Sequence, residues 1–433
     1  MDSEFGGGML QHFDFEPGYR NLNHGSFGTV PREITKHMHQ YQRLSEANPD
    51  RYIRFDYPII LDDCRAATAE FLKAPTDTVV FVPNATTGIN TILRNLTWDE
   101  DCRDVILYFS TIYGSCGKTI DYIVDSSRGL VSSQEIAISY PCEDHDIIEA
   151  FQATVHSCAA AGNRARVCLY DTVSSLPGVR LPFEELTKAC RNASVLSLVD
   201  GAQGVGMIDF DLWSLDPDFF VSNLHKWLFT PRGSAVLYVP LRNQHMIAST
   251  LPTSHGYVPK TNVRPNPLPQ SNKSPFVTNF EFTGSIDTSP FVCVKHAMEW
   301  RQRVLGGETR IMEYVQTLAQ EGGKIVARIL GTEVLDNSSK TLSRCGMTNI
   351  ALPVDAKAMT VKGRDLMLRY MLEDYHTFIP IFVLHGRVWA RISAQVYLDK
   401  KDFEWAGHML LELCERFKHS SASNLEQTYW THL

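Results

Sequence analysis

Short apolar runs separated by polar turns fill the middle of the chain, from about Tyr57 to Pro240. Continuous apolar runs of this kind are typical of strands buried on both faces, and the helical patterns between them indicate crossover connections. The region is therefore predicted to form a mostly parallel sheet covered by helices. The predicted strands are Thr78–Val82, Val105–Phe109, Arg166–Tyr170, Val195–Val199, Phe219–Ser222 and Ala235–Val239.

The flanking segments have different patterns. Residues 1–48 form an arm with a short segment around Tyr19–Gly28 and a helix that opens at Pro31, a residue suited to a first helical turn. A loop rich in Pro, Asn and Ser follows the central region at Tyr257–Pro275. We predict an arm (1–48), a large domain (49–284) and a smaller C-terminal α/β domain (285–433) that includes part of the arm. The predicted elements of the small domain are helices at Pro290–Leu305, Thr309–Ile329 and Lys362–Glu373, strands at Met347–Leu352 and Val388–Ser393, and a final helix after Asp402, before a polar tail from Ser420.

Composition narrows the class of protein. A chain of 433 residues exceeds what one core usually organises, and a net charge of −8 gives no global basic field for nucleic acid. The apolar runs are too short to cross a bilayer, and the first residues lack the pattern of a secretory signal. The ten cysteines form no CxxC pair and no metal-ligand spacing. We expect a cytoplasmic protein that binds no metal, membrane or nucleic acid.

An acid and a lysine follow two of the predicted strands. Val195–Val199 ends on Asp200, and the strand at Phe219–Ser222 is followed by Lys226. The carboxyl ends of strands in an open α/β sheet face the ligand crevice. A Schiff-base lysine must lose its proton, and a pyridine ring that accepts electrons needs an anion beside its nitrogen. Taken singly, Asp200 is more often a helix cap and Lys226 a solvated surface residue.

Two further motifs favour binding of anionic groups. Asn84-Ala85-Thr86-Thr87-Gly88 opens a helix, whose first turn offers free N–H groups to a phosphate; alone, this motif is more often a plain N-cap. Arg391 lies in the strand-like Trp389–Ser393, and its planar fork suits a carboxylate. Alone, such an arginine is more often a structural ion-pair residue.

The order of these motifs, together with Gln203 three residues after Asp200, His225 before Lys226, and Thr283-Gly284, resembles class V pyridoxal phosphate (PLP) enzymes of the aminotransferase superfamily over nearly the whole chain. The resemblance implies the PLP-dependent transferase fold (aminotransferase fold type I), an α/β architecture with a mostly parallel, seven-stranded central sheet and a smaller C-terminal α/β domain. It also implies that residues 49–284 bind PLP, and that a homodimer places its active sites at the subunit boundary.

The roles of single residues follow from the same resemblance. Lys226 is similar to the Schiff-base lysine and proton carrier, Asp200 to the partner of the pyridine nitrogen, and Gln203 to the donor to the ring hydroxyl. Arg391 corresponds to the arginine that holds the substrate carboxylate. The remaining implied contacts are a ring stacked on PLP from Tyr113, phosphate ligands from Thr86, Thr87, Asn223 and His225, and a phosphate contact from Thr283 to the other subunit. Asn223 stands where many members have serine.

The segments Leu22–Gly28 and Leu251–Gly256 resemble the isopenicillin N epimerase-like branch, whose fungal members include a C–S lyase of the ergothioneine pathway and a PLP enzyme of the loline pathway. Asn23 and His24 in the first segment are predicted to contact substrate. The branch implies amino-acid chemistry through an external aldimine and a Cα carbanion, in secondary metabolism, that cleaves or replaces a side-chain substituent. An epimerase or aminotransferase, or a catalytically dead PLP-fold binding protein, are the alternatives. A persulfide relay is disfavoured, because His376–Ala390 contains no cysteine.

Overall fold

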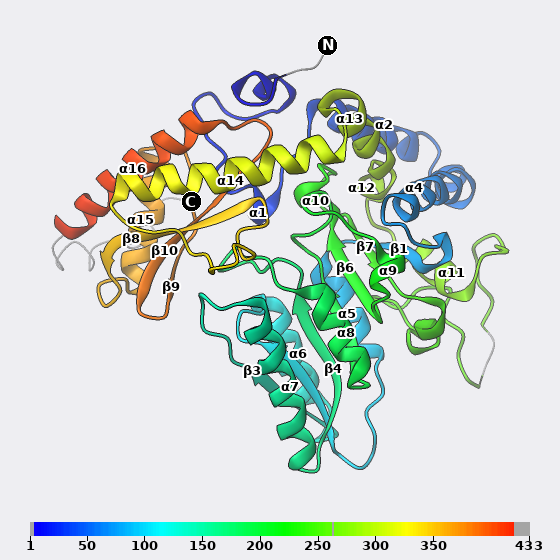
Figure 1. Cartoon of the computed structure of the whole chain (residues 1–433). Helices are drawn as coiled ribbons and strands as arrows, with labels where there is room; N and C mark the ends of the chain where they lie inside the picture. The colour runs from blue at the N-terminus through cyan, green and yellow to red at the C-terminus, as the bar shows by residue number, and fades with distance from the viewer. Residues whose placement is uncertain (1–3, 262–263, 420–433) are drawn as a thin grey trace.

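Two β-sheets organise the protein (Figure 1). The computed structural model describes residues 4–261 and 264–419. The larger sheet has seven strands in the order β1-β7-β6-β5-β4-β2-β3. They are β1 (Val79–Val82), β2 (Asp104–Phe109), β3 (Val131–Ile136), β4 (Arg164–Asp171), β5 (Leu196–Asp200), β6 (Phe219–Asn223) and β7 (Ala235–Tyr238). Its surrounding helices are α4 (Tyr57–Phe71), α5 (Ala85–Asn95), α6 (Gly114–Ser126), α7 (Asp144–Ala160), α8 (Phe183–Asn192) and α10 (Leu224–Trp227).

The sheet is mixed, because one strand reverses. Strands β2 to β6 pair in parallel, whereas β7 runs antiparallel to both β1 and β6. The predicted α/β fold with a seven-stranded, mostly parallel sheet is confirmed. Strand β3 was not predicted, since only Val131 and Ile136 at its ends are buried and its polar middle lies at the sheet edge.

The second sheet has three antiparallel strands in the order β8-β10-β9. Helices α14 and α16 pack side by side, and Gly322 permits their close approach, because a Cβ there would lie 2.3 Å from Cδ1 of Phe403 (Figure 1). The predicted helix over 290–305 is two helices that meet at Cys293, and β9 was not predicted. The elements are α12 (Ser289–Val292), α13 (Val294–Leu305), α14 (Glu308–Leu330), β8 (Met347–Asp355), α15 (Val361–Glu373), β9 (Ile381–Leu384), β10 (Arg387–Ser393) and α16 (Lys400–His419).

The N-terminal arm packs against the part of the chain that carries the second sheet. It contains a 3₁₀ helix (Gly7–His12), α1 (His24–Phe27) and α2 (Arg32–Ala47). Gly6 N donates to Val396 O over 2.8 Å, and Ser393 N donates to Leu22 O over 2.8 Å. The arm therefore reaches the end of β10. The domain boundaries at 48 and 284 stay predictions, and the predicted polar tail lies outside the described residues.

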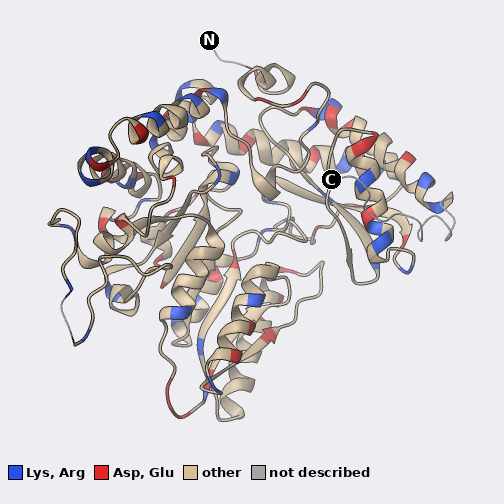
Figure 2. Ribbon diagram, turned by 180° about the vertical axis from the view of Figure 1, so that it is seen from behind, with Lys and Arg blue, Asp and Glu red and all other residues tan. Residues whose placement is uncertain are grey.

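Charged side chains of both signs are scattered over the outer helices and loops (Figure 2). The strands of the large sheet carry few of them, in keeping with their almost continuous burial. Among residues 4–261 and 264–419, no helix is both long and apolar enough to cross a membrane. All ten cysteines are unpaired thiols.

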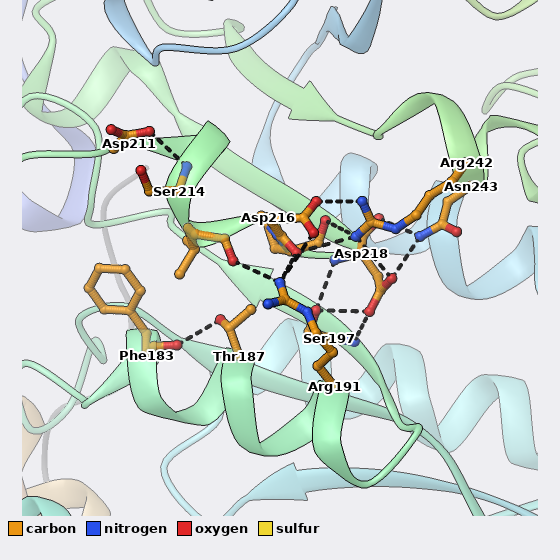
Figure 3. A network of polar contacts seen from close by, with 12 residues as sticks. Phe183, Thr187, Arg191, Ser197, Asp211, Ser214, Asp216, Asp218, Arg242 and Asn243 are labelled. Atoms are coloured by element: carbon orange, nitrogen blue, oxygen red, sulfur yellow. Dashed lines mark hydrogen bonds and ion pairs between the residues drawn. The ribbon is translucent and has the colours of Figure 1, made fainter.

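A polar network fastens the start of β5 to the turn that leads into β6 (Figure 3). The carboxylate of Asp218 accepts hydrogen bonds from Ser197 N and Ser197 Oγ, both over 3.0 Å, and from Asn243 Nδ2 over 2.9 Å. Arg242 bonds both Asp218 and Asp216, whose φ of 47° puts it in the left-handed region. This network fixes the amino ends of the strands whose carboxyl ends form the site described below.

We expect Asp218→Ala to lower the free energy of unfolding by about 2 kcal/mol, because the buried Ser197 N–H and hydroxyl lose their acceptor. Chemical denaturation would measure the change. Asp209→Ala is the matched control, since the Asp209 side chain is 79% exposed and reaches Lys73 only at 3.9 Å. An effect no larger than that of the control would show that the network adds nothing to stability.

Candidate active site

Asp200 and Lys226 lie after neighbouring strands at the carboxyl edge of the large sheet. Asp200 ends β5 and is 4% exposed. Its Oδ1 accepts a hydrogen bond from Ala202 N over 2.9 Å, and its Oδ2 accepts one from Cys116 Sγ over 3.5 Å. Lys226 follows β6 in α10, is largely enclosed, and forms no ion pair with the described residues. The two groups thus share one edge, as expected for a ligand crevice.

Burial sets the protonation of both groups. It lowers the pKa of Lys226 to about 8, against the opposing charge of Asp200. It also raises the pKa of Asp200 above its ordinary value, although the Ala202 N–H and the Lys226 charge act the other way. The site therefore holds an amine that loses its proton near neutral pH beside a buried carboxylate.

We expect the rate at which the apoprotein captures PLP to rise with pH, with a midpoint of about 8. The unprotonated amine is the nucleophile, and a lowered pKa means that the amine is protonated below this pH and free above it. Stopped-flow absorbance of PLP mixed with the apoprotein between pH 6 and 9 would measure the rate. A rate that is flat up to the ordinary range of lysine would contradict the lowered pKa.

The first turn of α5 forms a second polar group at this edge. Asn84 caps the helix by accepting from Thr87 N over 2.8 Å, and Asn223 Oδ1 accepts from Ala85 N over 2.9 Å. The backbone N–H and hydroxyl of Thr86 have no partner among the described residues. His225 uses Nδ1 on Ser234 O at 3.0 Å, which leaves Nε2 available. These donors suit an anion at the helix N-terminus.

Arg391, 1% exposed, is held by the turn Leu22–Gly28 of the arm and by Ser175 in the loop after β4. Its Nη2 donates to Asn23 Oδ1 over 2.7 Å and to Ser26 Oγ over 2.8 Å, and its Nη1 donates to Ser175 O over 2.7 Å. Its Nε is buried without a partner in the described structure. Burial lowers the pKa of Arg391 to about 10, so the guanidinium stays charged at neutral pH.

The same turn also contacts the lysine segment. His24 is fully buried and bonds Lys226 O through Nε2 at 2.7 Å and Tyr397 Oη through Nδ1 at 2.9 Å. Gly28 has a φ of +62°, and a Cβ on it would lie 1.9 Å from His225 O. The turn therefore joins Arg391 to the Lys226 segment, with no room for a side chain at Gly28.

Gln203 belongs to this junction as well. Its Nε2 donates to Gly25 O over 2.7 Å, and its Oε1 accepts from Trp227 Nε1 over 2.8 Å. One amide N–H remains for a ligand. His24 has both ring nitrogens engaged, so its contacts favour a structural role, and its predicted contact with substrate stays a prediction.

Two of the predicted site residues are not tied to this cluster by side-chain hydrogen bonds among the described residues. Tyr113 is the N-cap residue of α6 and is 46% exposed, and Thr283 lies partly buried in the loop after α11 (Pro275–Glu281). Neither forms a side-chain hydrogen bond to the site among the described residues. Conversely, Asp171, Ser175 and Ser26 belong to the site and were not predicted; for Asp171, its place directly after a predicted strand was an available signal.

Comparison with known proteins agrees with this arrangement. The family model described as "Aminotransferase class-V" matches residues 25–115 and 149–362. The L-cysteine desulfhydrase-like protein lolT1 of Epichloe uncinata is 37% identical over 440 residues, covering 95% of this chain and 96% of that protein. The hercynylcysteine sulfoxide lyase of Schizosaccharomyces pombe is 28% identical over 412 residues, covering 95% and 98%. The chain belongs to the class V aminotransferase family.

Solved structures share its fold. A mutant of C-DES with glycine covalently linked to its PLP cofactor superposes with a TM-score of 0.72 at 17% identity, covering 94% of this chain and 99% of that one. The apo cysteine desulfurase of Thermococcus onnurineus NA1 gives a TM-score of 0.72 at 15% identity, covering 96% and 100%. The predicted PLP-dependent transferase fold and the predicted branch are confirmed.

The chain is therefore a PLP-dependent class V enzyme related to cysteine desulfhydrases and C–S lyases. The described residues fit the cofactor. Among them, the amine of Lys226 forms no ion pair, a buried carboxylate lies at the same edge, and the donors of Thr86 at a helix N-terminus have no partner. When bound, PLP supplies an electron sink for the Cα of an amino acid. The protein supplies the orientation of the substrate, the exclusion of water and a proton carrier.

Proposed function

We propose that this class V enzyme acts on an amino acid of small-molecule, secondary metabolism and cleaves or replaces a substituent on its side chain. The observation that carries the proposal is that lolT1 and the hercynylcysteine sulfoxide lyase align with nearly the whole chain. Their names point to cysteine and a cysteine-derived sulfoxide. A C–S bond is therefore the favoured bond to cleave, and bond formation at the same carbon is the related alternative.

The proposed roles of the residues follow their positions. Arg391 binds the substrate carboxylate, and its Nε, which has no partner among residues 4–261 and 264–419, is one donor for it. Lys226, with a pKa of about 8, takes the Cα proton and returns it. Asp200 faces the ring nitrogen. Further roles are stacking on the ring for Tyr113, a contact with the ring hydroxyl for Gln203, and binding of the phosphate for Thr86, Thr87, Asn223 and His225.

We further propose a cytoplasmic homodimer. Its support is that Thr283 forms no side-chain hydrogen bond with the predicted cofactor residues in the described part of its own chain, which is compatible with a role at a second subunit's phosphate. We also propose that Asn23 and His24 contact the substrate. Light scattering of the purified protein would measure its mass, and a fully active monomer would contradict the dimer.

The test of the activity is mass spectrometry of PLP-loaded enzyme with an amino-acid panel in heavy water. The panel includes S-substituted cysteines, their sulfoxides and γ-substituted homoserines. Release of pyruvate together with a thiol or sulfenate, or a cyclised product, is the expected result and names the bond. Lys226→Ala is the matched control for reactions of free PLP.

Other outcomes favour other chemistry. An isopenicillin N epimerase of Amycolatopsis lactamdurans is 25% identical over 408 residues, which makes epimerisation the second candidate. Deuterium at Cα with an intact side chain would support it, and chiral analysis of the product would follow. Conversion of the panel to 2-oxo acids with accumulation of pyridoxamine phosphate would identify an aminotransferase and refute the proposed reaction.

A further inference from the structure

A second buried carboxyl lies beside Asp200. Asp171 ends β4, and the strand register pairs it with Asp200 at the end of β5. Residues paired in this way on parallel strands project their side chains from the same face of the sheet. Asp171 is 6% exposed and Asp200 4%. Two carboxyl groups are thus held side by side at the edge that carries Lys226.

The two carboxyls differ in their partners. Asp200 accepts hydrogen bonds from Ala202 N and Cys116 Sγ. The carboxyl of Asp171 forms no hydrogen bond or ion pair with the described residues. A charged carboxylate is stabilised by donors, so this asymmetry places the negative charge on Asp200.

The charges around the pair allow only one carboxylate. The titratable groups that face Asp171 are Asp200 on β5, Lys226 on α10, Cys116 on α6 and Tyr140 after β3. Only Lys226 among these groups is a cation, and two acids on paired positions of neighbouring buried strands resist ionising together. Burial, followed by the charge of Asp200, raises the pKa of Asp171 well above its ordinary value.

We propose that Asp171 and Asp200 form a carboxyl pair that shares one proton, held by Asp171, and that Asp171 is a positioning residue that confines the negative charge of the site to Asp200. The inference rests on the proposed role of Asp200 as the partner of the ring nitrogen. A neutral Asp171 adds no second charge beside Lys226 and has one O–H to donate. A deprotonated Asp171 would attract the same ring proton and raise the pKa of the lysine.

The test is infrared spectroscopy of the full-length chain labelled with ¹³C at the aspartate carboxyls, with and without PLP. At pH 7 the wild type is expected to show the C=O band of a protonated carboxyl that is lost in Asp171→Asn. Asp209→Asn, at an exposed position, is the control and should leave the band unchanged. Absence of this band in the wild type at pH 7 would overturn the proposal.

Coupling between the two groups is tested in Asp200→Asn, which keeps Asp171 and so does not depend on the folding of Asp171→Asn. Removal of the neighbouring charge should move the midpoint at which the band disappears to lower pH by at least about one unit. An unchanged midpoint would refute the pair. The proposed activity is independent of this readout: the band without any lyase activity would refute the function alone, and activity without the band would refute the pair alone.

Discussion

Lys226→Ala is expected to lower kcat/KM by at least about 10⁴-fold, because one side chain supplies both the nucleophile that holds the cofactor and the Cα proton carrier. The visible absorbance of the Schiff base between Lys226 and PLP should disappear with it. Lys226 forms no ion pair with the described residues, but its charge opposes the effect of burial on Asp200, so its loss should also raise the pKa of Asp200 further. Absorbance spectra, and steady-state kinetics with whichever amino acid of the panel is converted, would measure both effects.

Two variants separate the lysine's chemistry from its charge. Lys226→Arg keeps a cation near Asp200 without an amine that loses its proton near neutral pH, so it should be as inactive as Lys226→Ala. Lys118→Ala removes a surface lysine whose side chain is 85% exposed, and it should behave as wild type. Substantial activity in Lys226→Arg would show that the lysine acts only through its charge.

The strands at the core of the fold were predictable because a strand buried on both faces appears in the sequence as a continuous apolar run. The run at Val195–Val199 corresponds to β5, and the run at Phe219–Ser222 to β6. The carboxyl-edge rule then led to Asp200 and Lys226, which the structure brings to the same edge. The same rule applied one residue past Tyr170 leads to Asp171, so this second carboxyl was within reach of the sequence.

The other strands and contacts could not be predicted, because the pattern of apolar and polar residues does not show which distant residues meet in the fold. Strand β3 is exposed along its middle, so its residues show no apolar run. Gln203 Nε2 donates to the backbone oxygen of Gly25, 178 positions away, and Gln203 Oε1 accepts from Trp227 Nε1. The roles of His24 and Gly28 likewise follow from close contact with the backbone of the lysine segment. Only the folded chain shows that the arm's turn is the junction between Arg391 and Lys226.

Because Arg391 lies at this junction, a large change in KM is expected in Arg391→Lys. We expect KM for the amino-acid substrate to rise by about 100-fold, which corresponds to about 2.8 kcal/mol, while the absorbance of bound PLP stays as in wild type. A lysine keeps the charge but lacks the planar fork. It therefore cannot hold Asn23 and Ser175 while it also binds a carboxylate. Initial-rate kinetics over a range of substrate concentrations would measure KM and kcat separately.

The same strand offers the control. Arg387→Lys changes an exposed arginine at the start of β10 that pairs with Glu333, and it should leave KM unchanged. Asn23→Ala keeps the Arg391 charge and removes one of its anchors, so a smaller rise in KM, of about tenfold, is expected from the loss of one hydrogen bond to a charged group. If Arg391→Lys left KM unchanged, another residue would have to bind the carboxylate. If KM rose as much in Asn23→Ala as in Arg391→Lys, the affinity for the substrate would depend on how Asn23 positions the guanidinium of Arg391, and not on the planar shape of that guanidinium.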